Sequence, residues 1–396
     1  MAANQPSPAA QTERIPFWHD PGKRAIVSQV VVLSLVFLLG YYIFSNTQAN
    51  LRRQAIATGF GFINREAGFA IGESLIRYSA ADTYAQALLV GVLNTVSVAF
   101  IGIILTIILG IFVGVARLSS NWLLARLAAG YVEVLQNIPI LLQLFFWYSL
   151  FHDSLPLPRQ SYHPFPGVFI NNRGFYFPIP AFHPAYYWVG ATLLLAGGTS
   201  FLLKIWARRR QDQTGQRFPV LLVSLVLFVL LPFAAWLAGG APTELNVPHL
   251  RGFNFEGGLS FSPEFAALLL GLVLYTSAFV AEIVRAGIQA IPRGQTEAAM
   301  SIGLKPGMVL TLIILPQALR VIIPPLTSQM LNLTKNSSLA VAIGYPDFVS
   351  VANTTINQTG QAIEGVALIM VVYLFFSLVT SAYMNWYNKK KALVER

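Results

Sequence analysis

A run of polar side chains at the end of the apolar stretch 308–333 is well suited to hold a small charged molecule. Ser328, Asn332 and Lys335 follow one another at intervals of four and three residues, which places them on one helical face. Further hydroxyl and amide groups lie at Thr334, Asn336, Ser337 and Ser338. An ammonium group beside such donors can bind a carboxylate. The stripe therefore predicts a translocation path, although interhelical hydrogen bonds that hold a bundle together would use the same residue types.

The sequence shows no recognisable enzyme site. The phosphate-binding pattern Gly-x-x-x-x-Gly-Lys-Ser/Thr is absent, and the one Gly-Lys pair, Gly22-Lys23, is followed by Arg24. Zinc-protease, serine-hydrolase and paired-carboxylate patterns do not stand out either. There is no cysteine, and the histidines in 152–183 lack the spacing of metal ligands. We therefore expect no catalytic residue, no metal and no cofactor on this chain.

Composition indicates an integral membrane protein. The chain is 55% hydrophobic and 11% charged, whereas soluble domains have about 25% charged residues. About twenty apolar residues are needed to cross the hydrocarbon of a bilayer. Eight windows meet that need: 26–45, 87–116, 131–151, 186–203, 219–238, 264–284, 308–333 and 364–387. The sequence therefore predicts an all-α membrane protein with about eight transmembrane helices and both termini on one side.

The distribution of Lys and Arg predicts which side holds the termini. Alternating segments carry 17 basic residues, against seven in the other loops before residue 264. Because basic residues favour the cytoplasmic side, both termini and the loop 291–307 are predicted to be cytoplasmic. The loop 46–85 disagrees, since it places four Arg residues on the opposite side, and part of it is predicted to lie along the interface. This pattern explains the net charge of +10 without nucleic acid.

Residues 291–307 form a short polar loop between two apolar spans. Thr296 is predicted to cap a short helix, Glu297 would lie at its positive end, and Gly303 would end it. Pro306 would open the next helix. An apolar ridge is formed by Ala298, Ala299, Ile302 and Gly303. Such a ridge can dock in the groove of another protein, although an amphipathic connector on the membrane would look similar.

This loop resembles the cytoplasmic coupling (EAA) loop of importer-type ABC permeases, the membrane subunits that separate ATPases drive. The matching residues are Glu297-Ala298-Ala299, Gly303, Ile313 and Leu315-Pro316. The resemblance assigns ATPase coupling to Gly294, Glu297, Ala298, Ala299, Gly303 and Pro316. It implies two ATP-binding subunits as partners, and Mg-ATP would be bound by those subunits.

Residues 86–151 resemble the amino-acid-importing branch of the same permeases. The branch has a Gly-x-x-Asn-Thr opening, an Ala-Arg-Leu-Ser exit and a Glu-x-x-x-Asn-x-Pro-x-Leu start of the next helix. The matching residues are Gly91, Asn94, Thr95, 116–119, Glu133, Asn137, Pro139 and Leu141. Gln136 departs from the basic residue expected in many relatives. Gly110 and Gly114 form a Gly-x-x-x-Gly pair that would allow close helix approach, although a mere surface of small residues is the alternative.

The order of the segments predicts a type I permease core with an insertion. The predicted parts are cytoplasmic tails at 1–25 and 389–396, a first span with an outer segment at 26–85, core parts at 86–151 and 264–388, and two extra spans in 152–263. This long form resembles the larger permease subunit of importers for polar L-amino acids, neutral or acidic. The resemblance implies a second homologous permease, a periplasmic amino-acid-binding protein, contact with membrane lipid and a bacterial inner (plasma) membrane location. Which amino acids pass, and which permease subunit holds them, stays open.

Three prolines interrupt the span 308–333. Pro316, Pro324 and Pro325 each lack a backbone donor, so the helix is predicted to kink or unwind inside the membrane. Such backbone is tolerated where it lines a watery cavity, as in many transporters. An ion-gradient-driven secondary amino-acid transporter is the alternative function, but it would usually place acidic groups at mid-membrane. The predicted spans carry Asp and Glu only near their ends.

Overall fold

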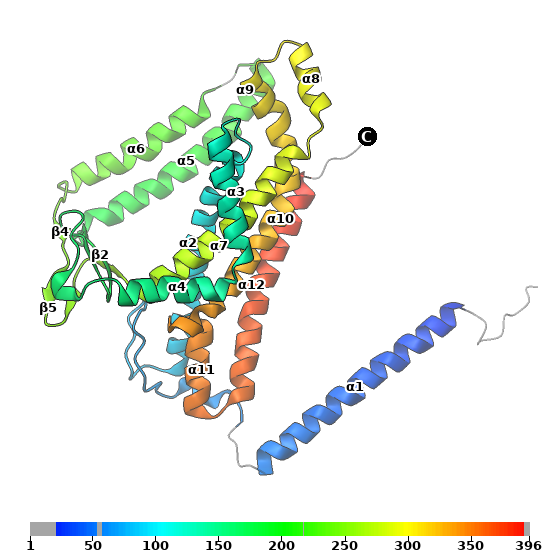
Figure 1. Ribbon diagram of the computed structural model, residues 1–396, viewed down its shortest axis with the longest axis vertical. Helices are drawn as coiled ribbons and strands as arrows, with labels where there is room; N and C mark the ends of the chain where they lie inside the picture. The colour runs from blue at the N-terminus through cyan, green and yellow to red at the C-terminus, as the bar shows by residue number, and fades with distance from the viewer. Residues whose placement is uncertain (1–20, 54–57, 217, 392–396) are drawn as a thin grey trace, which may run out of the picture.

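Helices make up most of the structure, as expected for an all-α membrane protein. The computed structural model describes residues 21–53, 58–216 and 218–391. Within these ranges seven helices are long and apolar enough to cross a membrane, or eight when one bent pair counts as a span. The long helices are α1 (Pro21–Arg53), α2 (Tyr84–Ala116), α5 (Ala185–Thr214), α6 (Val220–Ala238), α7 (Pro263–Gln289), α10 (Leu315–Asn336) and α12 (Ala362–Lys391). They confirm the predicted number of spans, and most of them gather into one bundle (Figure 1).

The predicted span 131–151 is not one helix. α3 (Trp122–Asn137) and α4 (Ile140–Asp153) meet at an angle of 103°. Pro139 lies between them and provides no backbone donor. The carbonyls of Leu135 and Ile138 instead accept hydrogen bonds from Gln143 Nε2, both at 3.0 Å. The prediction of a continuous span is therefore wrong, because side-chain bonds from Gln143 stabilise a sharp bend.

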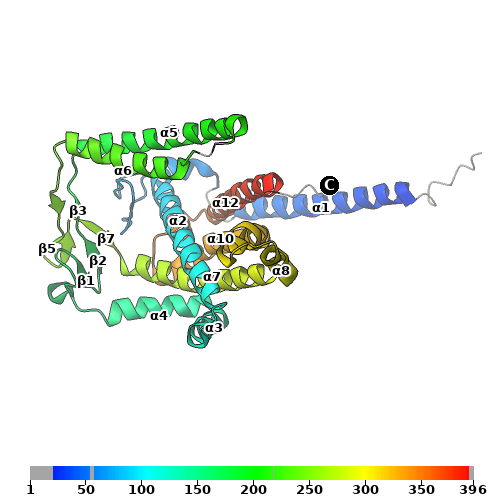
Figure 2. The same cartoon turned by 90° about the horizontal axis from the view of Figure 1, so that it is seen from above.

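α7 is the centre of the bundle and packs against α2, α3, α4 and α10 (Figure 2). Its Leu268 and Leu272 are fully buried and share one apolar cluster with Leu144 of α4 and Leu333 of α10. Any displacement of α7 must therefore move several neighbouring helices with it.

The close approach of α2 to α7 depends on two glycines. A Cβ at Gly110 would lie 2.6 Å from the Cβ of Val280, and a Cβ at Gly114 would lie 2.7 Å from the Ala281 carbonyl oxygen. Both distances are too short for a side chain without movement of the helices. The Gly-x-x-x-Gly pair is therefore a packing contact between helices, one of the two interpretations that the sequence allowed.

Gly114→Val should destabilise the bundle measurably. The new side chain would overlap the α7 backbone at Ala281, and overpacking of this kind costs about 1–3 kcal/mol. Gly130→Val is the matched control, because a Cβ at Gly130 meets nothing within 4 Å. Thermal unfolding of the purified chain in detergent should show a midpoint several degrees lower for Gly114→Val than for Gly130→Val. Equal midpoints for the two variants would contradict the packing role.

The insertion contains a helical pair and a set of short strands. α5 and α6 pack mainly on each other, and they stand beside the main bundle in both views (Figures 1 and 2). The strands, which were not predicted, are β1 (Phe169–Asn171), β2 (Gly174–Phe177), β3 (Ile179–Pro180), β4 (Leu245–Asn246), β5 (His249–Arg251), β6 (Asn254–Glu256) and β7 (Leu259–Phe261). All pairs are antiparallel, in the orders β1-β2-β7, β3-β4 and β5-β6. The strands thus tie the start of α7 to the loop after α4. That loop also contains the 3₁₀ turn η3 (Pro158–Gln160).

The proline-rich span is irregular next to Pro316, one of the three prolines at which a kink or unwinding was predicted. It consists of α9 (Pro306–Val309), the π-helical turn η4 (Leu310–Ile314), α10 and the 3₁₀ segment η5 (Ser337–Ile343). In η4 the Leu315 N–H bonds the Leu310 carbonyl, so the widened turn directly precedes Pro316 and makes room for its ring. α10 then runs without interruption through Pro324 and Pro325. Unwinding at those two prolines is therefore not observed.

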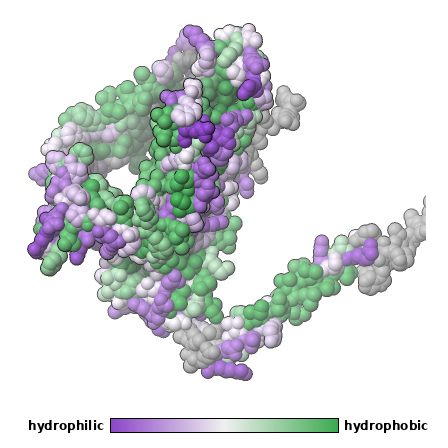
Figure 3. All heavy atoms as spheres, viewed as in Figure 1, coloured by the Kyte–Doolittle hydropathy of each residue, from purple (hydrophilic) through white to green (hydrophobic). Residues whose placement is uncertain are grey.

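The loop after α1 packs on the end of the bundle opposite the 291–307 loop (Figure 1). It includes the 3₁₀ turn η2 (Phe60–Asn64), and its Phe62 and Ala67 are buried against Phe348 and Val351 of α11 (Phe348–Thr359). This segment of the predicted interfacial loop is thus held by protein contacts. α1 has no buried residue in its most apolar window and presents apolar side chains along its middle part, from Ile26 to Phe44 (Figure 3). The tail residues 1–20 and 392–396 lie outside the described part of the chain.

Candidate functional site

The predicted coupling helix is present as α8 (Arg293–Ser301), a short helix at one end of the molecule (Figure 1). It begins after Pro292, so the prediction that Thr296 caps it is wrong. Its end is as predicted. Gly303 has a φ of 85°, its N–H bonds the Met300 carbonyl at 2.9 Å, and the Leu304 N–H bonds the Ala299 carbonyl at 3.2 Å.

The surface of α8 is largely free within the described chain. Glu297 and Ala298 are exposed, and Ile302 just beyond the helix is 78% exposed. Ala299 is the one buried residue of α8. Gly294 is exposed with open space around it, and Pro316 is exposed at the second position of α10. The loop therefore presents a compact helix with one acidic group and an exposed apolar side chain next to it, which suits a docking contact.

Several basic segments reach the same end of the molecule as α8. The turn between α2 and α3 and the turn between α5 and α6 both lie there (Figure 1). The basic residues in or near these turns include Arg117 at the end of α2, Arg126 in α3, and Arg208, Arg209 and Arg210 near the end of α5. The fold thus brings to one end these five of the basic residues that the sequence assigned to one side of the membrane.

A cluster of ion pairs that the sequence did not predict links α2 to α7, in the part of α7 that leads to α8. Glu282 of α7 forms ion pairs with Arg117 at the end of α2 and with Arg285 one turn further along α7. Arg285 also donates from Nη1 to Gln289 Oε1 at 2.5 Å. Arg117 is 165 residues from Glu282 in sequence, so no spacing rule could have paired them.

The predicted substrate-path residues divide into two sets on α10 and η5. Ser328, Asn332 and Lys335 are exposed on one face, and their side chains make no hydrogen bond or ion pair with any described residue. The hydroxyls of Thr334, Ser337 and Ser338 instead donate to carbonyls of their own helix, those of Met330, Thr334 and Lys335. Asn336 is half-buried. The first set is thus free to meet a partner or a solute, whereas the hydroxyls of the second set are satisfied locally.

A groove runs beside Lys335. It has a volume of about 860 Å³ and lies between the end of α10 and α12, with Ser338, Met370, Tyr373 and Leu374 among its lining residues. Most of its wall is apolar, and Lys335 is its single cationic side chain.

The motif residues of the first core part bind backbone. Asn94 is buried, and its Nδ2 donates to the carbonyls of Glu73 at 2.8 Å and Pro346 at 2.9 Å. Thr95 Oγ1 accepts the Phe348 N–H at 3.0 Å, which attaches the start of α11 to α2. These two side chains therefore position the loop before α11 and the loop before α2 that contains Glu73.

The remaining residues of that motif lie at the bend between α3 and α4. Asn137 Nδ2 donates to the Glu133 carbonyl at 2.8 Å, and Pro139 separates the two helices. Glu133, Asn137 and Pro139 are exposed within the described chain. They shape the bend and leave an outward surface there.

Comparisons with known proteins find relatives over most of the chain. Residues 196–392 match the family described as "Binding-protein-dependent transport system inner membrane component". The chain is 49% identical over 381 residues to the general L-amino acid transport system permease protein AapQ of Rhizobium johnstonii, covering 96% of this chain and 94% of that protein. It is 41% identical over 411 residues to the glutamate/glutamine/aspartate/asparagine transport system permease protein BztB of Rhodobacter capsulatus, covering 96% of each.

A crystal structure of an amino acid ABC transporter with histidines shows a weak likeness, with a TM-score of 0.46 at 20% identity over 78% of this chain and 95% of that chain. The full-length matches confirm the resemblance that the sequence motifs indicated. The chain belongs to the amino-acid ABC transporter permeases, the inner-membrane components of binding-protein-dependent transport systems, and is a multi-pass transport subunit rather than an enzyme.

Proposed function

We propose that this chain is the permease subunit of an ATP-driven importer for polar L-amino acids, neutral or acidic, and that separate ATPase subunits drive it through α8. The observation that carries the proposal is an exposed short helix inserted directly between α7, the centre of the bundle, and the span that carries the polar face of α10. The similarity to a permease named for glutamate, glutamine, aspartate and asparagine supports the substrate class.

The coupling follows from how α8 is attached. α8 contacts both α9 and η4, so its movement is passed to the span that contains α10. α7 precedes α8 and packs on α10 and α2. Closure of two ATPase subunits would therefore shift α7 and the α9–α10 span together as a rigid body, provided that ATP binding favours one of two arrangements.

The substrate path is proposed along Ser328, Asn332 and Lys335. Their exposure on a membrane-spanning helix is unfavourable against lipid, so they should face a second, homologous permease or the watery path between the two. Lys335 would attract the carboxylate of an amino acid delivered by a periplasmic binding protein.

The proposed contact between α8 and the ATPase subunits also determines the orientation in the membrane. The basic turns lie at the α8 end, which should be cytoplasmic, so that ATPases can reach α8. Both termini would then be cytoplasmic in a bacterial inner membrane.

ATP dependence tests the proposed function against the secondary-transport alternative. The purified complex, with its co-purifying chains, should take up labelled L-glutamate or L-glutamine into proteoliposomes that contain Mg-ATP while ionophores collapse all ion gradients. Uptake should fall to background when ATP is replaced by a non-hydrolysable analogue. Uptake that needs an ion gradient and not ATP would overturn the proposal.

A further inference from the structure

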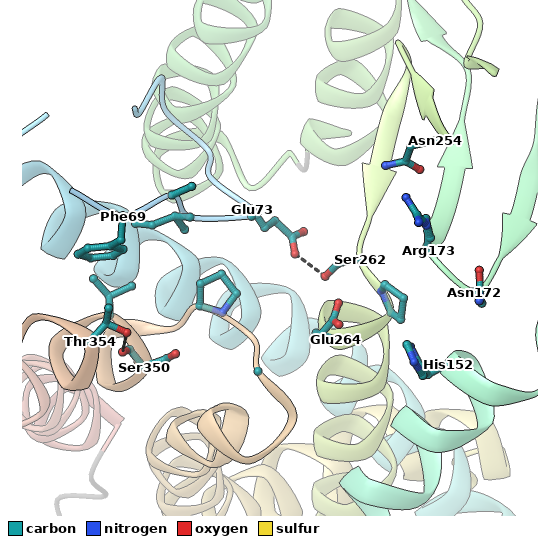
Figure 4. A pocket seen from close by; sticks show the side chains of 17 residues that line it. Phe69, Glu73, His152, Asn172, Arg173, Asn254, Ser262, Glu264, Ser350 and Thr354 are labelled. Atoms are coloured by element: carbon teal, nitrogen blue, oxygen red, sulfur yellow. Dashed lines mark hydrogen bonds between the residues drawn. The ribbon is translucent and has the colours of Figure 1, made fainter. Parts of the chain in front are cut away.

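A cavity of about 630 Å³ lies where the insertion meets the permease core, at the end of the molecule opposite α8. Its walls come from the outer loop 69–73, the start of α7, the first turns of α11 and the β1–β2 turn (Figure 4). None of the residues proposed for coupling or for the α10 path lines it. Its volume is within the range of about 300–1,000 Å³ that is usual for small-molecule sites.

The cavity holds charges of both signs. Glu73 and Glu264 lie on the core side, and Arg173 lies on the strand side (Figure 4). The ion pairs among described residues involve Glu282 and Glu256 but none of these three. Two carboxylates and one guanidinium thus line a single space without a charged partner from the described chain.

The environment of Glu73 favours a cationic neighbour. Its carboxylate accepts a hydrogen bond from Ser262 Oγ at 2.6 Å. Burial raises the pKa of the Glu73 carboxyl, and the negative charge of Glu264 adds to the increase, while the Ser262 hydrogen bond opposes it. An ammonium group placed between Glu73 and Glu264 would relieve the repulsion and compensate for burial of the charge.

The opposite wall contains an unsatisfied polar atom. Asn172 Oδ1 is buried and has no hydrogen-bond partner among the described residues, although Asn172 lines the cavity. Buried polar atoms without partners are uncommon and unfavourable, so a small movement of the β1–β2 turn that brings a donor to Asn172 Oδ1 would be favourable. Arg173 follows Asn172 directly and supplies a fork of donors suited to a carboxylate.

We propose that this cavity binds an amino acid as a zwitterion, with its α-ammonium group between Glu73 and Glu264 and its α-carboxylate on Arg173. The inference rests on the proposed function and deepens it, because it adds an outer binding site, separate from α10, that the insertion completes. Recognition is directed to the two groups that all amino acids share. Ser350 and Thr354 on the far wall leave room for a polar side chain.

Equilibrium binding to the full chain in lipid nanodiscs tests this assignment. L-glutamine should bind, whereas glutaramate, which lacks the α-ammonium group, and 4-aminobutanamide, which lacks the α-carboxylate, should each bind at least tenfold more weakly. Arg173→Gln and Glu73→Gln should each weaken L-glutamine binding at least tenfold. Arg251→Gln and Glu256→Gln are matched controls, since these residues form an exposed ion pair on the neighbouring β5–β6 turn, and both should bind normally.

Two further variants keep the test decisive. If Arg173→Gln fails to fold, as judged by gel filtration and thermal unfolding, Glu264→Gln and Asn172→Ala are measured instead, with the same weakening expected. Absence of L-glutamine binding in the parent chain, or binding at the parental affinity in both Arg173→Gln and Glu73→Gln, would overturn the inference while ATP-dependent uptake still supported the proposed function. Failure of that function would appear separately, as uptake that does not require ATP.

Discussion

Glu297→Lys should abolish import and substrate-stimulated ATP hydrolysis, while the chain still inserts in the membrane and folds. Glu297 is exposed on α8, and its side chain makes no hydrogen bond or ion pair with the described residues, so its replacement removes nothing from the fold. A reversed charge at the centre of a docking contact costs several kcal/mol, which corresponds to a loss of about 100-fold or more in affinity. Uptake into proteoliposomes and phosphate release should therefore both fall to the basal level of the isolated ATPases.

Asp212→Lys is the control for this variant. Asp212 is exposed near the end of α5, on the α8 end of the molecule, and its replacement makes the same change of charge outside the proposed contact. Normal stimulated hydrolysis is expected there. If Glu297→Lys retained full import, or if Asp212→Lys lost as much activity, the assignment of coupling to α8 would have to be abandoned.

The long helices could be predicted because membrane crossing depends directly on apolar length. The window 87–116 corresponds to α2 at Tyr84–Ala116, and the window 219–238 corresponds to α6 at Val220–Ala238. The end of α8 and the start of α9 could also be predicted from residue types. Gly303 adopts a positive φ, and Pro306 starts α9. Both signals are local, so one sequence suffices to read them.

Features that depend on contacts between distant segments could not be read in the same way. The bend after α3 rests on bonds from the Gln143 side chain to two carbonyls, and neither hydropathy nor proline content distinguishes it from a mild kink. The strands are two to four residues long, too short for a periodic pattern, and β2 pairs with β7 more than 80 residues later.

The same limit applies to the charged residues. Glu282 pairs with Arg117, which lies 165 residues earlier in the sequence. Glu73, Arg173 and Glu264 come from three segments that the fold alone brings around one cavity. Their types could be seen in the sequence, but their proximity could not.

Lys335→Met and Asn332→Leu should each lower the rate of amino-acid import by about 10- to 100-fold. Hydrogen bonds to charged groups contribute about 1.5–3 kcal/mol, and each 1.4 kcal/mol corresponds to a factor of ten. Both side chains are exposed on α10 and bond no described residue, so hydrogen bonds that hold this chain's own bundle cannot account for a loss. The measurement is the initial rate of ATP-dependent uptake over a range of substrate concentrations, which separates KM from kcat.

Thr334→Val provides the control on the same helix. The Thr334 hydroxyl donates to the Met330 carbonyl of its own helix at 3.0 Å, so removing it should change import little. Thermal unfolding of the assembled complex distinguishes a role of Lys335 in the substrate path from a role in the contact between permeases. If Lys335 meets the solute, Lys335→Met should leave the unfolding midpoint unchanged. Import at the parental rate in both Lys335→Met and Asn332→Leu would show that this face of α10 does not line the path. A lowered unfolding midpoint together with the parental KM would instead assign this face to the interface between permease subunits.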